Sequence, residues 1–121
     1  MGVFGGSYNI ITNNDIRSNT WYGIVIYSNG FIYNLFMSPE LNRTACVFNI
    51  VSYNNFIDNG ENAFFASSYF IIWKMNYWGK SIAGPYPISG KWGIPTFPIG
   101  LPVFNFDWYP AKEPYDIPGI N

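Results

Sequence analysis

Four aromatic residues that lie close to asparagines are the first candidates for binding a ligand. They are Trp21, Tyr22, Tyr33 and Tyr53. An aromatic ring offers a flat apolar surface on which a sugar ring can stack, and a neighbouring amide can bond a sugar hydroxyl group. We therefore predict that these four residues contribute to a carbohydrate-binding surface. Packing against the body of the protein is the alternative for each of them.

Charged residues offer a second kind of chemistry, because paired carboxylates can act as acid and base on a polysaccharide. The candidates are Asp15 and Asp58, and Arg17 and Lys74 are expected to share one face with Asp58. We expect Asp15 and Asp58 to lie two layers apart, about 10 Å along a stack of strands, and displaced sideways. Since nothing in the sequence pairs or desolvates these groups, scattered surface charge is the simpler interpretation.

Composition excludes several other classes of function. Charged residues make up 11% of the chain and its formal net charge is −1, so there is no basic stripe that would attract a nucleic acid. The chain has no histidine and a single cysteine, Cys46, which provides neither an internal disulfide nor the usual ligand sets of zinc and copper. We expect no metal and no cofactor. Neither a membrane span nor a secretory signal is predicted, because the required apolar runs are missing.

An internal repeat indicates how these residues are positioned. Residues 9–27 match residues 49–67 at an offset of 40 residues, and a period of 20 residues also aligns apolar positions. A fixed repeat describes a unit that buries its apolar face only against copies of itself. Short apolar runs separated by polar residues favour strands joined by sharp corners. We therefore predict an all-β solenoid of about four short coils that begin near Tyr8, Ser28, Phe48 and Ser68, with one apolar column formed by Ile11, Phe31, Val51 and Ile71.

Asparagines and glycines have structural interpretations in such a stack. Equivalent residues of parallel strands lie about 4.8 Å apart, so stacked asparagines can pass amide hydrogen bonds from layer to layer. Gly23, Gly30 and Gly60 are expected at corners that need a positive φ. Met37 to Arg43 interrupts the second coil and predicts a protruding loop, which also holds a glycosylation sequon at Asn42.

The chain changes character after residue 79. Prolines are interleaved with aromatic residues from Pro85 to Pro118, so regular strands and helices are not expected there. The aromatic content is too high for a disordered linker. We predict that residues 1–79 form the parallel coils and that residues 80–121 form an irregular C-terminal cap of the same domain.

Three motifs carry a resemblance to a known family. Residues 9–26 read Asn-x-Ile-x-x-Asn-x-Ile-x-x-Asn and then Gly-Ile-x-Ile, residues 76–79 read Asn-Tyr-Trp-Gly, and residues 106–115 read Phe-Asp-Trp-x-Pro-Ala-x-Glu-Pro-Tyr. They resemble NosD-like right-handed parallel β-helix repeat proteins of the archaeal surface-protein type. The resemblance implies a right-handed parallel β-helix, cut from the C-terminal part of a longer protein that is extracellular or at the cell surface. The family's link to copper delivery is not carried over, because no histidine is present.

Three functions remain open. A non-catalytic structural or carbohydrate-binding module of a cell-surface or secreted protein accounts best for the repeat and for the lack of clustered catalytic groups. An alternative is a fragment of a polysaccharide-active lyase, hydrolase or epimerase, since long β-helices of that kind place acids and bases in a surface groove. The third is a terminal piece whose open first coil, Gly5 to Ile11, docks on another chain or a second copy.

Overall fold

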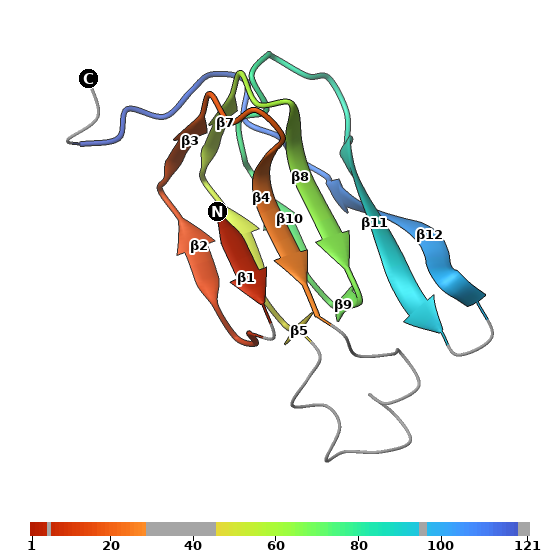
Figure 1. The fold of residues 1–121 in the computed structure, drawn as a ribbon. Helices are drawn as coiled ribbons and strands as arrows, with labels where there is room; N and C mark the ends of the chain where they lie inside the picture. Colours follow the sequence, from red (N-terminus) through yellow and green to blue (C-terminus); the bar gives the residue numbers. More distant parts are fainter. Residues whose placement is uncertain (5, 29–45, 95–96, 119–121) are drawn as a thin grey trace.

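The structure is a computed structural model that describes residues 1–4, 6–28, 46–94 and 97–118 of the chain. Every regular element in these ranges is a β-strand and none is a helix (Figure 1), which confirms the prediction of an all-β protein for this part. The strands are β1 (Gly2–Phe4), β2 (Ile10–Thr12), β3 (Asp15–Arg17), β4 (Tyr22–Tyr27), β5 (Cys46–Val47), β6 (Ile50–Ser52), β7 (Asn55–Ile57), β8 (Glu61–Ala66), β9 (Ser68–Tyr69), β10 (Ile72–Lys74), β11 (Tyr86–Ile94) and β12 (Phe97–Asp107).

Short strands stack in parallel layers. β2, β3 and β4 of the first layer pair with β6, β7 and β8 of the second, with Ile16 opposite Phe56 and Ile26 opposite Phe65. In the third layer, β9, β10 and β11 pair with β5, β6 and β8. Apolar residues of one layer therefore lie on apolar residues of the next at these inward-facing positions, and their side chains form a continuous core.

The largest sheet is an eight-stranded mixed sheet that curls into a half-barrel (Figure 1). Its strand order is β1-β4-β8-β11-β12-β10-β6-β2, so β1 and β2 are its edges. β12 runs antiparallel to β11 and pairs in parallel with β10 where Asp107 meets Trp73. β12 thereby joins the stack of β4, β8 and β11 to the stack of β2, β6 and β10. Because of this hairpin, the sheet is mixed and not purely parallel as predicted.

The predicted spacing of the layers is wrong. β2 pairs directly with β6, so no layer lies between them. Val51 pairs with Trp73 and not with Ile71, because the third layer is offset from the second by two residues more than the predicted period. Strands in direct pairing are about 4.8 Å apart, which leaves no room for another strand. The residues outside the described ranges include Gly30, Phe31, Tyr33, Asn42 and the predicted loop from Met37 to Arg43.

A long hairpin replaces part of the predicted irregular cap. β11 and β12 pair along most of their length, with Tyr86 opposite Asp107. Pro87 lies outside the stretch of β11 that pairs with β8, and Pro102 lies outside the single contact of β12 with β10. Each proline thus has one side without a partner strand, where a missing N–H group costs no hydrogen bond of the sheet.

The core lies between the stacked faces. Ile24, Ile26, Val51, Phe56 and Phe65 are completely buried, and burial of such apolar surface is the main source of stability in a domain of this size. The ring of Trp78 stacks between the rings of Phe56 and Tyr86, at centroid distances of 4.5 and 4.2 Å. The third layer is therefore fixed to the second by aromatic stacking as well as by strand pairing.

The predicted reason for glycine at the corners is wrong. Gly23 and Gly60 do not have positive φ angles, whereas several non-glycine corner residues do. A Cβ atom at Gly60 would lie 2.2 Å from the carbonyl oxygen of Thr20, and one at Gly23 would lie 2.5 Å from that of Asn62. Both glycines therefore allow two backbones to approach closely. The residues that adopt the left-handed conformation include Tyr8, Asn13, Ser18, Phe48, Tyr53, Asp58, Phe70 and Met75.

Candidate functional site

Stacked asparagines form a column through the layers. The backbone N–H of Asn14 donates to Oδ1 of Asn54 at 3.0 Å, and that of Asn54 donates to Oδ1 of Asn76 at 3.1 Å. The side-chain amides of Asn54 and Asn76 donate to the carbonyl oxygens of Ile11 and Val51, both at 2.9 Å. These amides are satisfied within the stack, which confirms the predicted stacking of Asn14 and Asn54. Asn76 is not part of the predicted column. Two shorter columns pair Asn9 with Asn49 and Asn19 with Asn59.

Asp107 closes the longest column. Its carboxylate is completely buried and accepts hydrogen bonds from the backbone of Met75, Asn76 and Tyr109 and from the side chains of Asn76 and Trp78. A carboxylate is tolerated at such depth only when its oxygens are well paired. Sequence reasoning does not identify Asp107, although the two motifs that meet here, around residues 76–78 and 106–108, were both visible as motifs.

The chain after β12 is held on the layers by Asn55 and Tyr115. The side chain of Asn55 accepts a hydrogen bond from the backbone N–H of Tyr115 and donates one to its carbonyl oxygen, both at 2.8 Å. The Tyr115 hydroxyl group donates to the carbonyl oxygen of Met75 at 2.6 Å. Burial raises the pKa of this phenol, and Tyr53 and Asp107 raise it further. Tyr53 packs edge-on against Tyr115, with ring centroids 5.9 Å apart. This position fits packing against the body of the protein, the alternative to carbohydrate binding for this residue.

The charged residues considered for acid–base chemistry come together only in part, because Asp15 and Asp58 both act on Arg17, whereas Lys74 lies on another strand. The Arg17 guanidinium donates two hydrogen bonds of 2.6 Å to the Asp15 carboxylate, and this contact raises the pKa of Arg17. Because β3 pairs directly with β7, Asp15 and Asp58 belong to neighbouring layers and not to layers two apart. Lys74 lies on β10, in a different sheet from β3 and β7, so it does not share a face with Arg17. The predicted separation of Asp15 and Asp58 by two layers and the predicted position of Lys74 are therefore wrong, whereas Arg17 does lie within the influence of the Asp58 charge.

A hollow of about 450 Å³ lies between this ion pair and the C-terminal segment. Its acidic lining residues are Asp15 and Asp116. Hydrolysis by an acid–base pair needs two carboxyl groups that are free to exchange protons with the substrate or with water. Both oxygens of Asp15 are bonded to Arg17, so this hollow does not offer such a pair.

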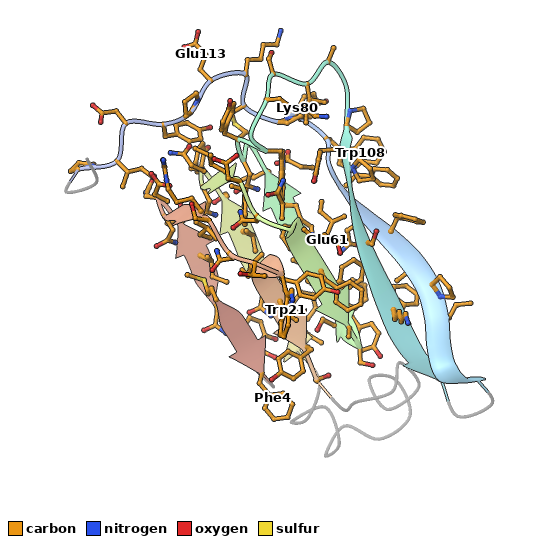
Figure 2. The ribbon with its side chains drawn as sticks, turned by 45° about the horizontal axis from the view of Figure 1, so that its top comes forward. Phe4, Trp21, Glu61, Lys80, Trp108 and Glu113 are labelled. Carbon is orange, nitrogen blue, oxygen red and sulfur yellow. The ribbon has the colours of Figure 1, made fainter. Side chains whose placement is uncertain are left out.

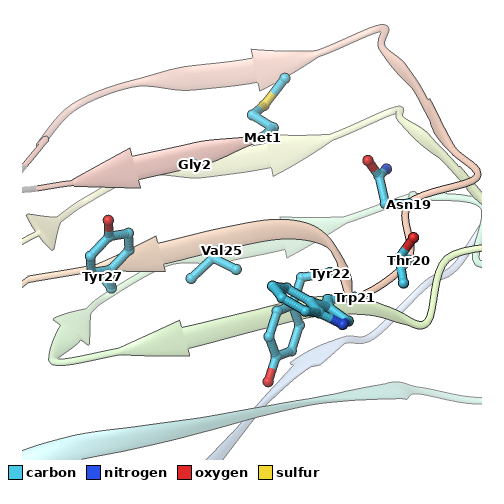
Figure 3. A pocket seen from close by; sticks show the side chains of 8 residues that line it. All are labelled: Met1, Gly2, Asn19, Thr20, Trp21, Tyr22, Val25 and Tyr27. Atoms are coloured by element: carbon cyan, nitrogen blue, oxygen red, sulfur yellow. The ribbon is translucent and has the colours of Figure 1, made fainter.

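Trp21 and Tyr22 line an open hollow of about 640 Å³ at the corner between β3 and β4 (Figure 3). Trp21 is 78% exposed and Tyr22 is 39% exposed. The hollow continues along the outer side of β4, past Val25 to Tyr27 (Figure 3). Two of the four aromatic residues predicted to bind carbohydrate are therefore neighbours on one surface. The complete lining is Met1, Gly2, Asn19, Thr20, Trp21, Tyr22, Val25 and Tyr27.

Contacts between two layers hold this corner in place. The backbone N–H of Glu61 donates to the carbonyl oxygen of Trp21 at 2.5 Å, and that of Gly60 donates to Asn19 at 2.9 Å. The ring of Tyr22 lies 5.6 Å from that of Phe64 on the neighbouring strand β8. The backbone at Trp21 is therefore fixed while its side chain remains exposed.

A second hollow of about 490 Å³ shares three lining residues with the first, Thr20, Trp21 and Tyr22, and adds Gly60 and Glu61. Glu61 is exposed and lies opposite Tyr22 in the pairing of β4 with β8. It was not among the residues predicted for the site. The repeat that aligns residues 9–27 with residues 49–67 was the available signal, because it places residue 61 beside residue 21.

The two hollows are suited to binding. They combine exposed aromatic rings with the Thr20 hydroxyl group, the Asn19 amide and the single carboxylate of Glu61. These linings contain one carboxylate and therefore not the pair of carboxyl groups that hydrolysis of a glycoside usually uses. Across the part of the chain that the structure describes, no group of three or more histidine, cysteine, aspartate or glutamate residues is placed to hold a metal ion.

Comparisons with known proteins do not assign the chain to a family. Searches against protein-family models, curated proteins and solved structures give no match. Within the described ranges, no helix has the length and apolar character needed to cross a membrane. The NosD-like resemblance and the extracellular location therefore stay predictions.

Proposed function

We propose that this chain is a non-catalytic carbohydrate-binding module whose ligand lies against Trp21 and Tyr22. The observation that carries the proposal is the 78% exposure of the Trp21 side chain at the edge of a hollow. Aromatic side chains usually bury most of their large apolar surface, and apolar surface that is left exposed beside a hollow is typical of a binding site. A sugar ring matches this platform in shape and in its mixture of apolar faces and polar edges.

The rigidity of the corner supports the proposal. Tyr22 is the first residue of β4 and pairs with Glu61 of β8, and Trp21 directly precedes it and accepts a backbone hydrogen bond from Glu61. A binding group on paired strands loses less conformational entropy when the ligand binds than one on an unpaired loop. The stack of layers therefore acts as a scaffold that presents its aromatic side chains in a fixed arrangement.

The scaffold in this proposal is a right-handed parallel β-helix of the NosD-like type, carried by a cell-surface or secreted protein. The parallel pairing of β2 with β6, β3 with β7 and β4 with β8 supports it. The asparagine column through Asn14, Asn54 and Asn76 supports it as well, because stacked amides are expected where equivalent corners of successive coils coincide.

A glycan array tests the proposal. We expect the full chain to bind at least one class of oligosaccharide, and Trp21→Ala to weaken that binding by at least about tenfold, as is common for a central aromatic anchor. Trp108→Ala is the matched control, because Trp108 is also well exposed, at 61%, but lies outside both hollows (Figure 2). Binding that survives Trp21→Ala, or no binding to any glycan, would contradict the proposal.

A further inference from the structure

We propose that the hollow beside Glu61 gives the site a preference for sugars that carry a free amino group, such as oligomers of glucosamine. This inference rests on the proposed function, since it assigns the substrate class of the same surface. It follows from the chemistry of the second hollow, in which Trp21 and Tyr22 lie next to a carboxylate.

Trp21 and Tyr22 belong to both hollows. A sugar ring on either aromatic side chain therefore lies within reach of the Glu61 side of the site. The backbone hydrogen bond from Glu61 to Trp21, at 2.5 Å, and the opposite placement of Tyr22 and Glu61 in the strand pairing fix the two corners relative to each other. Figure 2 shows Trp21 and Glu61 on the same side of the molecule.

Glu61 is a carboxylate without a cationic partner. Among the residues that the structure describes, the only ion pair between side chains joins Arg17 to Asp15, and no lysine or arginine lines either hollow. The Met1 ammonium group lies at the first hollow and donates to the carbonyl oxygen of Gly23 at 3.0 Å. The cation that would complement Glu61 is therefore absent from the hollow that contains it.

An ammonium group on the ligand supplies this cation. It can donate a charge-assisted hydrogen bond to the Glu61 carboxylate and is attracted to the faces of the Trp21 and Tyr22 rings. A neutral sugar gains neither interaction, and a uronic acid is repelled by Glu61. The expected order of affinity is therefore amino sugar, then neutral sugar, then uronic acid.

Titration calorimetry near pH 6, with glucosamine and N-acetylglucosamine oligomers of equal length, tests this preference. These ligands differ in the acetyl groups, which remove the positive charge. We expect the glucosamine oligomer to bind about fivefold more tightly to the full chain, mainly through the charge-assisted contact of its ammonium group with the exposed Glu61 carboxylate. Glu61→Gln should bring the two affinities close together, and added salt should do the same.

Glu113→Gln is the matched control, because it removes the same charge from an exposed residue on the C-terminal segment, away from Glu61 (Figure 2). The preference should survive it. Equal affinities for the two oligomers, or a preference that Glu113→Gln removes as fully as Glu61→Gln does, would overturn the inference and leave carbohydrate binding standing. Failure of both oligomers and of all other glycans to bind would instead overturn the proposed function.

Discussion

Polarity is inverted between the corners of the stack and the outer side of β4. At the corners, Asn54, Asn76 and Asp107 are completely buried. On the outer side, Trp21 and Tyr27 are 78% and 42% exposed. Globular proteins usually bury their aromatic residues and expose asparagine and aspartate, so each region needs its own explanation.

The hydrogen-bond partners supply that explanation. The buried amides and Asp107 bond to one another and to the backbone, so their role is fulfilled inside the molecule. Some other exposed aromatic residues pack on one another, as in the stack of Tyr8, Phe48 and Phe70 with ring centroids 5.5 and 5.2 Å apart. Trp21 has no ring contact with any other described residue and lines both hollows. Tyr109 and Phe104 are also exposed but line neither hollow, so the position of Trp21 beside the hollows distinguishes the candidate site from the scaffold.

Removal of the Asp107 carboxylate is expected to have the largest effect on stability. Asp107→Ala takes the acceptor away from buried donors on Asn76 and Trp78, so the free energy of unfolding should fall by about 3–5 kcal/mol. Urea denaturation followed by tryptophan fluorescence measures this change. Asp107→Asn keeps one acceptor oxygen, so its free energy of unfolding should lie between those of the wild type and Asp107→Ala. Wild-type stability in Asp107→Ala would show that the hydrogen bonds of Asp107 at the end of the asparagine column do not stabilise the fold.

A comparison of two asparagines in one column should give the next largest effect. Asn54 is completely buried and bonds both to the first layer and to the third, whereas Asn14 is partly exposed and bonds only to the second layer and to its own turn. Asn54→Ala should therefore cost about 2–4 kcal/mol and Asn14→Ala about 1 kcal/mol. Equal losses in thermal and urea unfolding would contradict a column that is anchored from both sides.

Alkaline pH should destabilise the fold through Tyr69. Burial raises the pKa of this phenol from 10.0 to about 12, opposed in part by a hydrogen bond with Ser67. The unfolded chain then releases this proton at lower pH than the folded chain. The contribution of Tyr69 to stability is therefore full below pH 10 and is lost as the pH rises toward about 12.

Urea unfolding between pH 9 and 12 measures this loss, and Tyr69→Phe should make the decline shallower. Tyr115, whose pKa is also raised by burial, adds to the decline in both proteins. Tyr109→Phe controls for the removal of an exposed phenol, since Tyr109 is 78% exposed. An identical pH dependence in the wild type and in Tyr69→Phe would contradict the assigned burial.

Replacement of Trp21 should have the smallest effect on stability. Its side chain contributes little to the core, so Trp21→Ala should change the free energy of unfolding by less than about 0.5 kcal/mol. Differential scanning calorimetry checks this value, with Asp107→Ala as the unstable reference. A large loss of stability in Trp21→Ala would assign the residue to the scaffold and weaken the case for a site.

The sequence predicts the parts of the fold that depend on periodicity. Asn14 and Asn54 stack as predicted, and Ile11 and Val51 face the same core, because a repeated pattern places like residues in like positions. The distance between layers is not predictable in this way, since periods of 20 and 40 both align these residues. Only the direct pairing of β2 with β6 distinguishes them.

The candidate site is predictable only in part, for a related reason. Trp21 and Tyr53 both lie close to asparagines in a repeat, so sequence alone ranks them equally. Tyr53 packs against Tyr115, and this contact depends on how a segment about 60 residues away folds back over the layers. Asp107 is not predictable from the sequence for the same reason, because its contacts with its partners depend on the pairing of β12 with β10.

Indole N–H signals give the most direct test of the central claim, that ligands bind at Trp21 and not elsewhere on the scaffold. The chain has five tryptophans, so a ¹H–¹⁵N correlation spectrum contains one indole signal for each, assignable by substitution to phenylalanine. On titration with a glycan that the array identifies, we predict that the Trp21 signal shifts while those of Trp73, Trp78 and Trp108 stay in place. A shift of the Trp108 signal with an unchanged Trp21 signal would contradict the account.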